Sequence, residues 1–126
     1  MKSIDDLIQI VIKSAYKVHN ALGAGFLEKV YEKALCIELR KNGLNVASQY
    51  PIEVYYDNTL IGDYFADLLV EDCLIVEIKA VENLSIAHEK QIINYLAATG
   101  IDDGLLLNFG SSVNVKRKYR VYTKKH

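Results

Sequence analysis

Asp67, Glu77 and Lys79 are the residues of this 126-residue sequence whose types and spacing are best suited to chemistry. Carboxylate oxygens are hard ligands for a divalent cation such as Mg²⁺, and a bound cation lowers the pKa of a water molecule. Glu77 and Lys79 lie two positions apart in an apolar segment, so on a strand their side chains leave the same face about 7 Å apart. This spacing is compatible with a metal site at which water attacks a phosphodiester.

The alternative interpretation is a Glu–Lys pair on the solvated face of an antiparallel sheet. The surrounding run Leu74–Ala80 argues against it, because a segment this apolar is typical of a central strand. Buried charges persist when they are paired or bound to metal, and Asp67 also lies inside an apolar run. The metal site is therefore the preferred interpretation.

Gln91 and Tyr95 lie four positions apart in a segment with helical spacing, and His88 precedes Gln91 by three, so the three share one helix face. We expect this helix to pack across the sheet face that carries Glu77 and Lys79, with Gln91 near the lysine and Tyr95 nearer the core. The alternative is that Tyr95 is a core residue and Gln91 a partly exposed one. For His88, a surface or hydrogen-bonded histidine is the preferred interpretation.

Together these residues resemble the active-site signature of the PD-(D/E)XK nuclease superfamily, with Asp67, Glu77 and Lys79 in the acidic, acidic and lysine positions. Gln91 and Tyr95 match the Q-x-x-x-Y helix of the RecB-type branch of that superfamily. The resemblance covers nearly the whole chain, from about residue 8 to residue 122.

The resemblance implies a role for each site residue. Asp67, Glu77 and the main-chain carbonyl of Ile78 would hold Mg²⁺ or Mn²⁺, and Lys79 would orient or deprotonate the nucleophile and offset charge on the phosphate oxygens. The two residues of the Q-x-x-x-Y helix would position the lysine, the water or the substrate phosphate.

A second motif lies upstream, where Gly25, Glu28 and Tyr31 resemble the signature of the GxxExxY protein family within the same superfamily. This resemblance implies that the three form a fixed group, with Glu28 lining the active site as a further acidic residue. The alternative for Glu28 is a carboxylate favoured by the helix dipole in the first helical turn. Glu32 and Glu38 are expected to be solvated.

The implied function is that of an Mg²⁺-dependent nuclease acting on DNA rather than RNA. The main alternative is a nuclease-fold module that binds DNA or regulates without efficient turnover, as a homodimer or as a subunit of a DNA-processing assembly. A third interpretation is a metal hydrolase for a small phosphoester, whose site would be a closed pocket.

Hydrophobic periodicity predicts an α/β fold in one domain, 1–126, with a mixed sheet. This agrees with the restriction-endonuclease-like αβββαβ core that the resemblance implies, in which helices flank the central sheet, here with an extra N-terminal helix. The predicted elements are a helix over 4–22, a helix over 27–42, an antiparallel meander with strands over 52–56, 60–69 and 74–79, a helix between Ser85 and Gly100, and strands over 104–109 and 116–122.

The side-chain alternation of strands makes a further prediction about the loop between the second and third strands. A two-residue turn at Glu71-Asp72 would send Asp67 and Glu77 to opposite faces, where they cannot share a metal. We therefore predict an odd-numbered loop, for example Glu71 to Cys73, or a β-bulge that shifts the register by one.

Composition places limits on the class of protein. The sequence is 51% hydrophobic and 25% charged, and no apolar run is long enough to span a bilayer. The residues after Met1 lack the apolar stretch of a secretory signal, so a cytoplasmic location without membrane association is expected. Cys36 and Cys73 lack metal-site spacing and are expected to be small buried hydrophobic residues.

The formal net charge of −1 conceals an asymmetry. Between Asn42 and Val115 the strong bases are Lys79 and Lys90, against eleven acids, whereas six bases crowd the last eleven residues. The basic end is suited to contact phosphates. An equally supported interpretation is a solvated edge strand that its charges protect from aggregation.

Overall fold

The computed structural model describes residues 2–121. In this part of the chain three helices and five strands form a single mixed sheet with helices on both faces. The elements are α1 (Ile4–Leu22), α2 (Glu28–Lys41), β1 (Val46–Tyr56), β2 (Thr59–Val70), β3 (Leu74–Lys79), α3 (Ile86–Thr99), β4 (Asp103–Phe109) and β5 (Val113–Tyr119).

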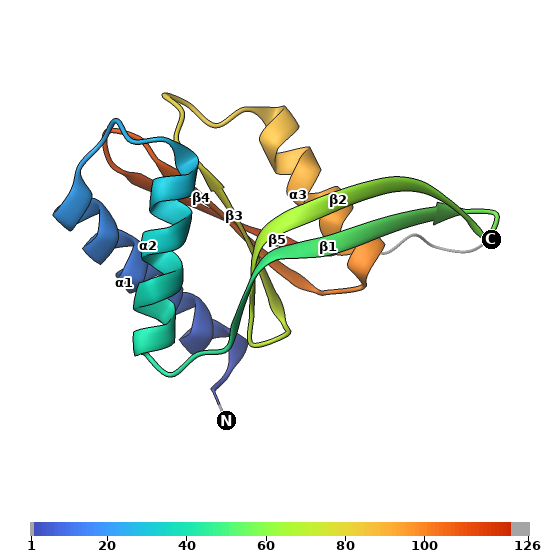
Figure 1. Ribbon diagram of the computed structural model, residues 1–126, viewed down its shortest axis with the longest axis horizontal. Coiled ribbons are helices and arrows are strands. Elements are labelled where there is room, and N and C mark those ends of the chain that lie inside the picture. The colour runs from blue at the N-terminus through green and yellow to red at the C-terminus, as the bar shows by residue number, and fades with distance from the viewer. Residues whose placement is uncertain (1, 122–126) are drawn as a thin grey trace.

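The strands lie in the sheet in their order along the chain, β1-β2-β3-β4-β5. β1, β2 and β3 are antiparallel neighbours, β3 and β4 are parallel and connected through α3, and β4 and β5 are antiparallel. The β1–β2 hairpin extends well beyond the rest of the sheet (Figure 1). The half of the hairpin nearer β3 belongs to the body of the sheet, whereas the half that ends in the β1–β2 turn lies beside α3 (Figure 1).

Two hydrophobic clusters cover the two faces. The larger packs α1 and α2 against one face of β2, β3 and β4, through residues such as Leu35, Val76 and Leu107. The smaller packs α3 against the other face, where Ile75 and Ile92 are fully buried. Burial of apolar side chains on both faces explains why β3 and β4 are nearly continuous hydrophobic runs.

The structure confirms the predicted fold class and order of elements. The first helix has the predicted bounds, and the third is capped by Ser85 and ends at Gly100, whose φ of 74° is left-handed. The strand bounds differ most in β1, which begins at Val46 rather than at residue 52, and in β5, which covers Val113–Tyr119 rather than 116–122. The prediction for Cys73 was wrong: this residue lies exposed in the β2–β3 loop, while Cys36 is buried as expected.

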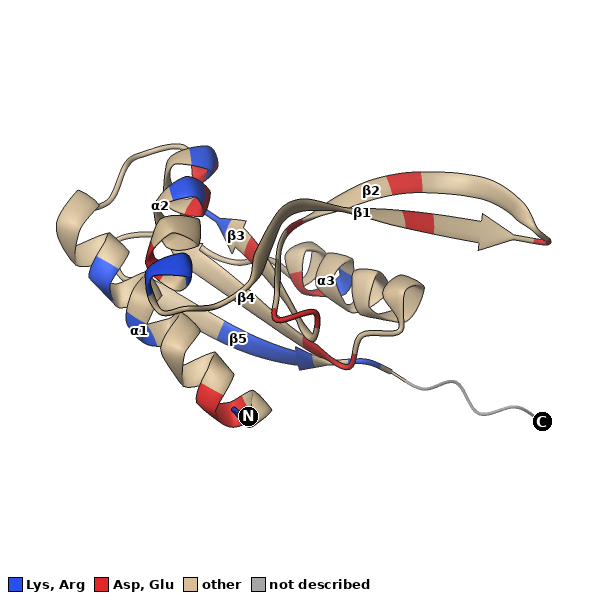
Figure 2. Cartoon of the chain, turned by 60° about the horizontal axis from the view of Figure 1, so that its bottom comes forward, with Lys and Arg blue, Asp and Glu red and all other residues tan. Residues whose placement is uncertain are grey.

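The basic segment near the C-terminus is largely neutralised. β5 is an edge strand whose basic band is visible in Figure 2, and its cations pair with acids of other elements. Lys116 and Lys118 pair with Glu89, and Arg117 pairs with Asp5 and Asp103. These pairs favour the edge-strand interpretation for the described part; Lys124 and Lys125 lie outside the described residues.

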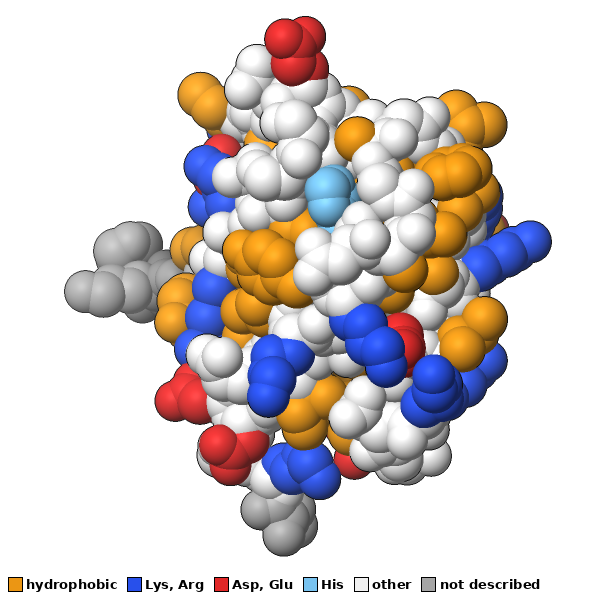
Figure 3. Space-filling model, turned by 90° about the vertical axis from the view of Figure 1, so that its left-hand side faces the viewer, with side chains coloured by type: hydrophobic (Ala, Val, Ile, Leu, Met, Phe, Trp, Pro, Cys, Tyr) orange, Lys and Arg blue, Asp and Glu red, His pale blue; other side chains and the backbone are white. Residues whose placement is uncertain are grey.

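The end of the molecule where α1 connects to α2 has a mixed surface. Figure 3 shows hydrophobic side chains there among Lys and Arg side chains. Phe26 and Leu27, which are 46% and 81% exposed, belong to this connection. Among residues 2–121 no helix is both long enough and apolar enough to cross a bilayer.

Candidate active site

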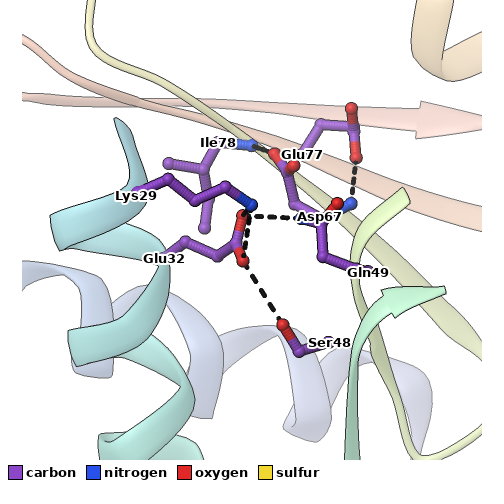
Figure 4. Close-up of polar contacts among 7 residues, drawn as sticks. All are labelled: Lys29, Glu32, Ser48, Gln49, Asp67, Glu77 and Ile78. Carbon is purple, nitrogen blue, oxygen red and sulfur yellow. Dashed lines mark hydrogen bonds and ion pairs between the residues drawn. The ribbon is translucent and has the colours of Figure 1, made fainter. Parts of the chain in front are cut away.

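Asp67 and Glu77 face each other where β2 leaves β3. The pairing of these strands runs from Val70↔Leu74 to Leu68↔Val76 and ends there. Beyond it, side chains replace the main-chain ladder: the Asp67 N–H donates to Glu77 Oε2 at 2.7 Å, and the Ile78 N–H donates to Asp67 Oδ2 at 2.8 Å (Figure 4). The two carboxylates are thus held next to each other by backbone donors from opposite strands.

The loop between β2 and β3 has the predicted odd length. Val70 pairs with Leu74, which leaves three loop residues, 71–73. Glu71 and Asp72 adopt left-handed conformations with φ of 50° and 56°, and the Cys73 N–H donates to the carbonyl of Val70. This register extrapolates to Asp67 opposite Glu77, so the parity condition for a shared site is met.

The hairpin twists sharply beside the site, a feature that the sequence does not show. In β1, Ser48 contacts α2 whereas Ile52 belongs to the cluster under α3, although both have even numbers. In β2, Leu68 belongs to the α1–α2 cluster whereas Ala66 belongs to the α3 cluster. The alternation of side chains between the two sheet faces is therefore interrupted in both strands. The interruption lies at Gln49 of β1 and, opposite it in β2, between Ala66 and Leu68.

Gln49 takes up this twist. Its φ of 55° is left-handed, which is unfavourable for a residue with a Cβ. Its side-chain amide Nε2 donates to Glu32 Oε1 at 3.0 Å, and the neighbouring Ser48 Oγ donates to Glu32 Oε2 at 3.3 Å (Figure 4). A strained residue held by side-chain contacts next to two paired carboxylates is typical of a functional site.

The prediction that Glu32 is solvated was wrong. Its side chain is 6% exposed, and besides Ser48 and Gln49 it binds Lys29 Nζ at 3.3 Å. The missed signal is its spacing, because Glu32 lies four residues after Glu28 on the same face of α2. Glu32 therefore joins α2 to the twist of β1 and adds a third carboxylate near the site.

We expect Gln49→Gly to be more stable than Gln49→Ala by about 1 kcal/mol, because both delete the amide bond to Glu32 and only alanine meets the left-handed penalty. Urea unfolding of the two variants measures the difference. In an ordinary strand the order is reversed, since glycine weakens strands. A more stable alanine variant would show that residue 49 is not held in the left-handed conformation.

The negative charges of Asp67 and Glu77 are not compensated by neighbouring groups of the described chain, and the pKa values of both carboxyl groups are raised. Burial is the main cause that raises the pKa of Glu77 to about 8, and the charge of Asp67 raises it further. Burial likewise raises the pKa of Asp67 to about 6, against the hydrogen bond from the Ile78 N–H, and the charge of Glu32 adds to the rise. Lys79 lowers both pKa values but does not offset the desolvation.

This carboxylate pair fits a divalent cation. Within residues 2–121 neither Asp67 nor Glu77 forms an ion pair, and one oxygen of each carboxylate accepts no hydrogen bond. Those two oxygens are also in contact with solvent. In this part of the chain the one side-chain nitrogen or oxygen that is both buried and without a hydrogen bond is Arg117 Nε, so an oxygen of this pair without a hydrogen bond is not buried. The pair thus offers two free hard oxygens to a cation.

The main-chain carbonyl of Ile78 lies on the same side of β3 as the carboxylate of Asp67. In an extended strand the N–H and C=O of one residue point to the same side, and the Ile78 N–H points to Asp67. The Ile78 carbonyl is therefore available beside the pair, as the predicted ligand set requires. The described residues contain no cluster of three or more His, Cys, Asp or Glu side chains suited to a metal, so a cation held here would need water molecules as further ligands, an arrangement that Mg²⁺ prefers.

The third helix lies where the sequence predicted. Lys79 Nζ donates to Gln91 Oε1 at 3.4 Å, which confirms that Gln91 lies near the lysine. Tyr95 is 8% exposed, and burial together with the charges of Glu77 and Asp67 raises its pKa, so its phenol borders the site as a neutral group. His88 is hydrogen-bonded, in agreement with the preferred interpretation of the sequence. Its Nδ1 accepts from the N–H of Ser85, the capping residue of α3.

Two residues of the motif Gly25, Glu28 and Tyr31 have different roles: Glu28 acts on the site through its charge, and Tyr31 is structural. Glu28 is exposed at the first turn of α2, and its charge contributes to the raised pKa of Asp67. Tyr31 is fully buried and stacks on Phe109 with ring centroids 4.6 Å apart. Its hydroxyl donates to the carbonyl of Gly23 at 2.6 Å and accepts from the N–H of Phe26 at 3.2 Å. Tyr31 therefore fastens the α1–α2 connection.

We expect Tyr31→Phe to lower the free energy of unfolding by about 1–3 kcal/mol, because two partly buried main-chain groups lose their hydrogen-bond partner. Chemical denaturation measures this, with Tyr16→Phe, an exposed tyrosine of α1, as the control. Equal stability of both variants would contradict the fastening role.

Comparisons with known proteins agree with this architecture. Residues 5–121 match the family described as the PD-(D/E)XK nuclease superfamily. The crystal structure of SSO0001 is similar in fold, with a TM-score of 0.62 at 16% sequence identity over 76% of this chain. The matched region is 52% of the length of SSO0001, so this chain spans about half of that protein. Among curated proteins there is no match to this sequence.

Proposed function

This chain belongs to the PD-(D/E)XK nuclease superfamily, and we propose that it is a metal-dependent nuclease that hydrolyses phosphodiester bonds in DNA. The observation that carries the proposal is the pair Asp67–Glu77, held face to face by backbone donors with one free oxygen each and followed by Lys79. Membership of the superfamily implies a nuclease-like function and contact with nucleic acid. The choice of DNA rests on the resemblance of Gln91 and Tyr95 to the RecB-type helix.

Mg²⁺ or Mn²⁺ is the proposed cofactor, held by Asp67, Glu77 and the Ile78 carbonyl. Such a cation supplies a water of lowered pKa and polarises the scissile phosphate. The raised pKa values of both carboxyl groups support the assignment, since two buried neighbouring carboxylates stay ionised at neutral pH when a cation compensates them.

The protein's own side chains have distinct roles in this proposal. Lys79 orients the attacking water and offsets negative charge that develops on the phosphate oxygens. Gln91 accepts a hydrogen bond from Lys79 Nζ and so holds the ammonium group near the carboxylates. Glu32 acts through Gln49, since it holds the twisted part of β1 that lies beside Asp67.

The test is a cleavage assay of the purified protein with single-stranded, duplex and branched DNA and with RNA, each in Mg²⁺, in Mn²⁺ and in EDTA. We expect cleavage of DNA with either cation and none in EDTA. Cleavage of RNA alone would replace the proposed substrate. Binding without cleavage of any substrate would favour a nuclease-fold module that binds DNA, as a homodimer or within a larger assembly.

A further inference from the structure

A cavity of about 630 Å³ lies between the projecting half of the β1–β2 hairpin and α3. Gly62 and Tyr64 line it from the hairpin, and Lys90, Gln91, Asn94 and Tyr95 line it from the helix. This volume is within the range of sites that hold a small molecule or one nucleotide. No role proposed above uses the cavity.

Tyr64 presents an aromatic surface to this cavity. A Cβ added at Gly62 would lie 2.9 Å from Cε2 of Tyr64, so the ring rests on the backbone of Gly62 and a larger residue there would displace it. The ring is 6.0 Å from that of Tyr95, at an interplanar angle of 43°, and Tyr64 is 49% exposed. A ring placed in this way has surface available for a planar partner to stack on.

The cavity adjoins the candidate active site through two of its lining residues. Gln91, which lines it, binds Lys79, and Tyr95, which also lines it, is close enough to Glu77 and Asp67 for their charges to raise its pKa. A strand with one phosphate at the carboxylates would therefore have a neighbouring nucleotide beside the cavity.

The polar groups of the cavity suit a nucleotide. Lys90 is the cation of the lining, which contains no carboxylate. The hairpin acids Glu53 and Asp63 are paired opposite each other, and neither lines the cavity. The amide of Asn94 makes no hydrogen bond within residues 2–121 and is free to bind the edge of a base.

We propose that this cavity is a subsite for one nucleobase of the substrate strand, which stacks on Tyr64 while Asn94 binds its edge and Lys90 its phosphate. The inference rests on the proposed nuclease function, which places the strand at the carboxylates. A base is favoured over a protein segment because the cavity adjoins that site and carries a cation and no acid. Base–aromatic stacking tolerates any sequence, so the subsite would anchor a strand without selecting one.

The test uses fluorescein-labelled single-stranded DNA of about 16 nucleotides with Ca²⁺ as the cation, and a series of the same oligonucleotide lacking one base at successive positions. For the wild type, one position should show about tenfold weaker binding when its base is absent. Tyr64→Ala should bind the complete oligonucleotide about tenfold more weakly and show no further loss at that position. Tyr64→Phe should retain the wild-type pattern, as should Tyr56→Ala, an exposed tyrosine of the hairpin tip that does not line the cavity.

Each other outcome overturns the subsite in a distinct way. If the wild type cuts DNA but the series is flat and Tyr64→Ala binds normally, the nuclease function stands and the base subsite is wrong. If Tyr64→Ala instead changes the sedimentation of the protein, the cavity is an interface between copies of the chain. If the wild type neither binds nor cuts any nucleic acid, the proposed function fails, and the subsite fails with it.

Discussion

Glu77→Gln is expected to lower metal-dependent cleavage by more than about a hundredfold while leaving the protein folded. Partners of metal ligands already affect metal affinity or activity by about 10–100-fold, so loss of a ligand itself should exceed that range. Glutamine keeps the size of the side chain and can still accept the N–H of Asp67, so the local structure should persist. Circular dichroism and cleavage assays measure the two effects separately.

The same substitution should change how stability depends on pH. The pKa of Glu77 is about 8 against an ordinary value of 4.5, so between these values the folded protein binds more protons than the unfolded chain. Stability of the metal-free protein therefore falls as pH rises through this range, and Asp67, with a pKa of about 6, adds to the fall in its lower part. Glu77→Gln should remove most of this slope and raise the metal-free Tm by about 5 °C at pH 8.

Calorimetry with and without Mg²⁺ or Mn²⁺ tests the assignment directly. The wild type should gain Tm with metal, and Glu77→Gln should gain little. Glu53→Gln, which neutralises an exposed acid of the hairpin, is the matched control and should behave as the wild type. Equal metal stabilisation of the wild type and Glu77→Gln would refute the metal site.

Lys79→Ala is expected to reduce cleavage by about 10²–10³-fold, the cost typical of removing one group that stabilises transition-state charge. Metal binding should persist, because the ammonium group is not a ligand. Since Lys79 lowers the pKa of both Asp67 and Glu77 electrostatically, its loss removes a cation that repels the metal. The metal-induced rise in Tm should therefore be equal to or larger than that of the wild type.

Lys33→Ala, at an exposed position of α2, is the control for this experiment and should cut at the wild-type rate. A Lys79→Ala variant that cuts normally would show that the lysine serves only as a hydrogen-bond partner of Gln91. A variant that also loses metal stabilisation would show that Lys79 acts by shaping the site rather than in the reaction. The two measurements together separate these roles.

Local sequence patterns determined much of the fold and the main site residues. Apolar spacing and the caps Ser85 and Gly100 predicted the helices, because capping and one-sided burial are short-range effects. The even spacing of Glu77 and Lys79 placed both on one face of a strand. Parity then required either an odd-numbered loop or a β-bulge, and the structure contains the three-residue loop 71–73.

The surroundings of the site were decided by tertiary structure. Nothing in the sequence around Gln49 predicts a left-handed backbone. This conformation arises because the hairpin must twist away from β3 to continue beside α3. Glu32 looks like any helical surface glutamate, yet it is buried because α2 packs against that twist. The sequence by itself thus determined which groups are candidates to bind a cation, through residue type and short-range spacing. Only the three-dimensional packing of distant segments decided which further groups surround them and how strongly their charges interact.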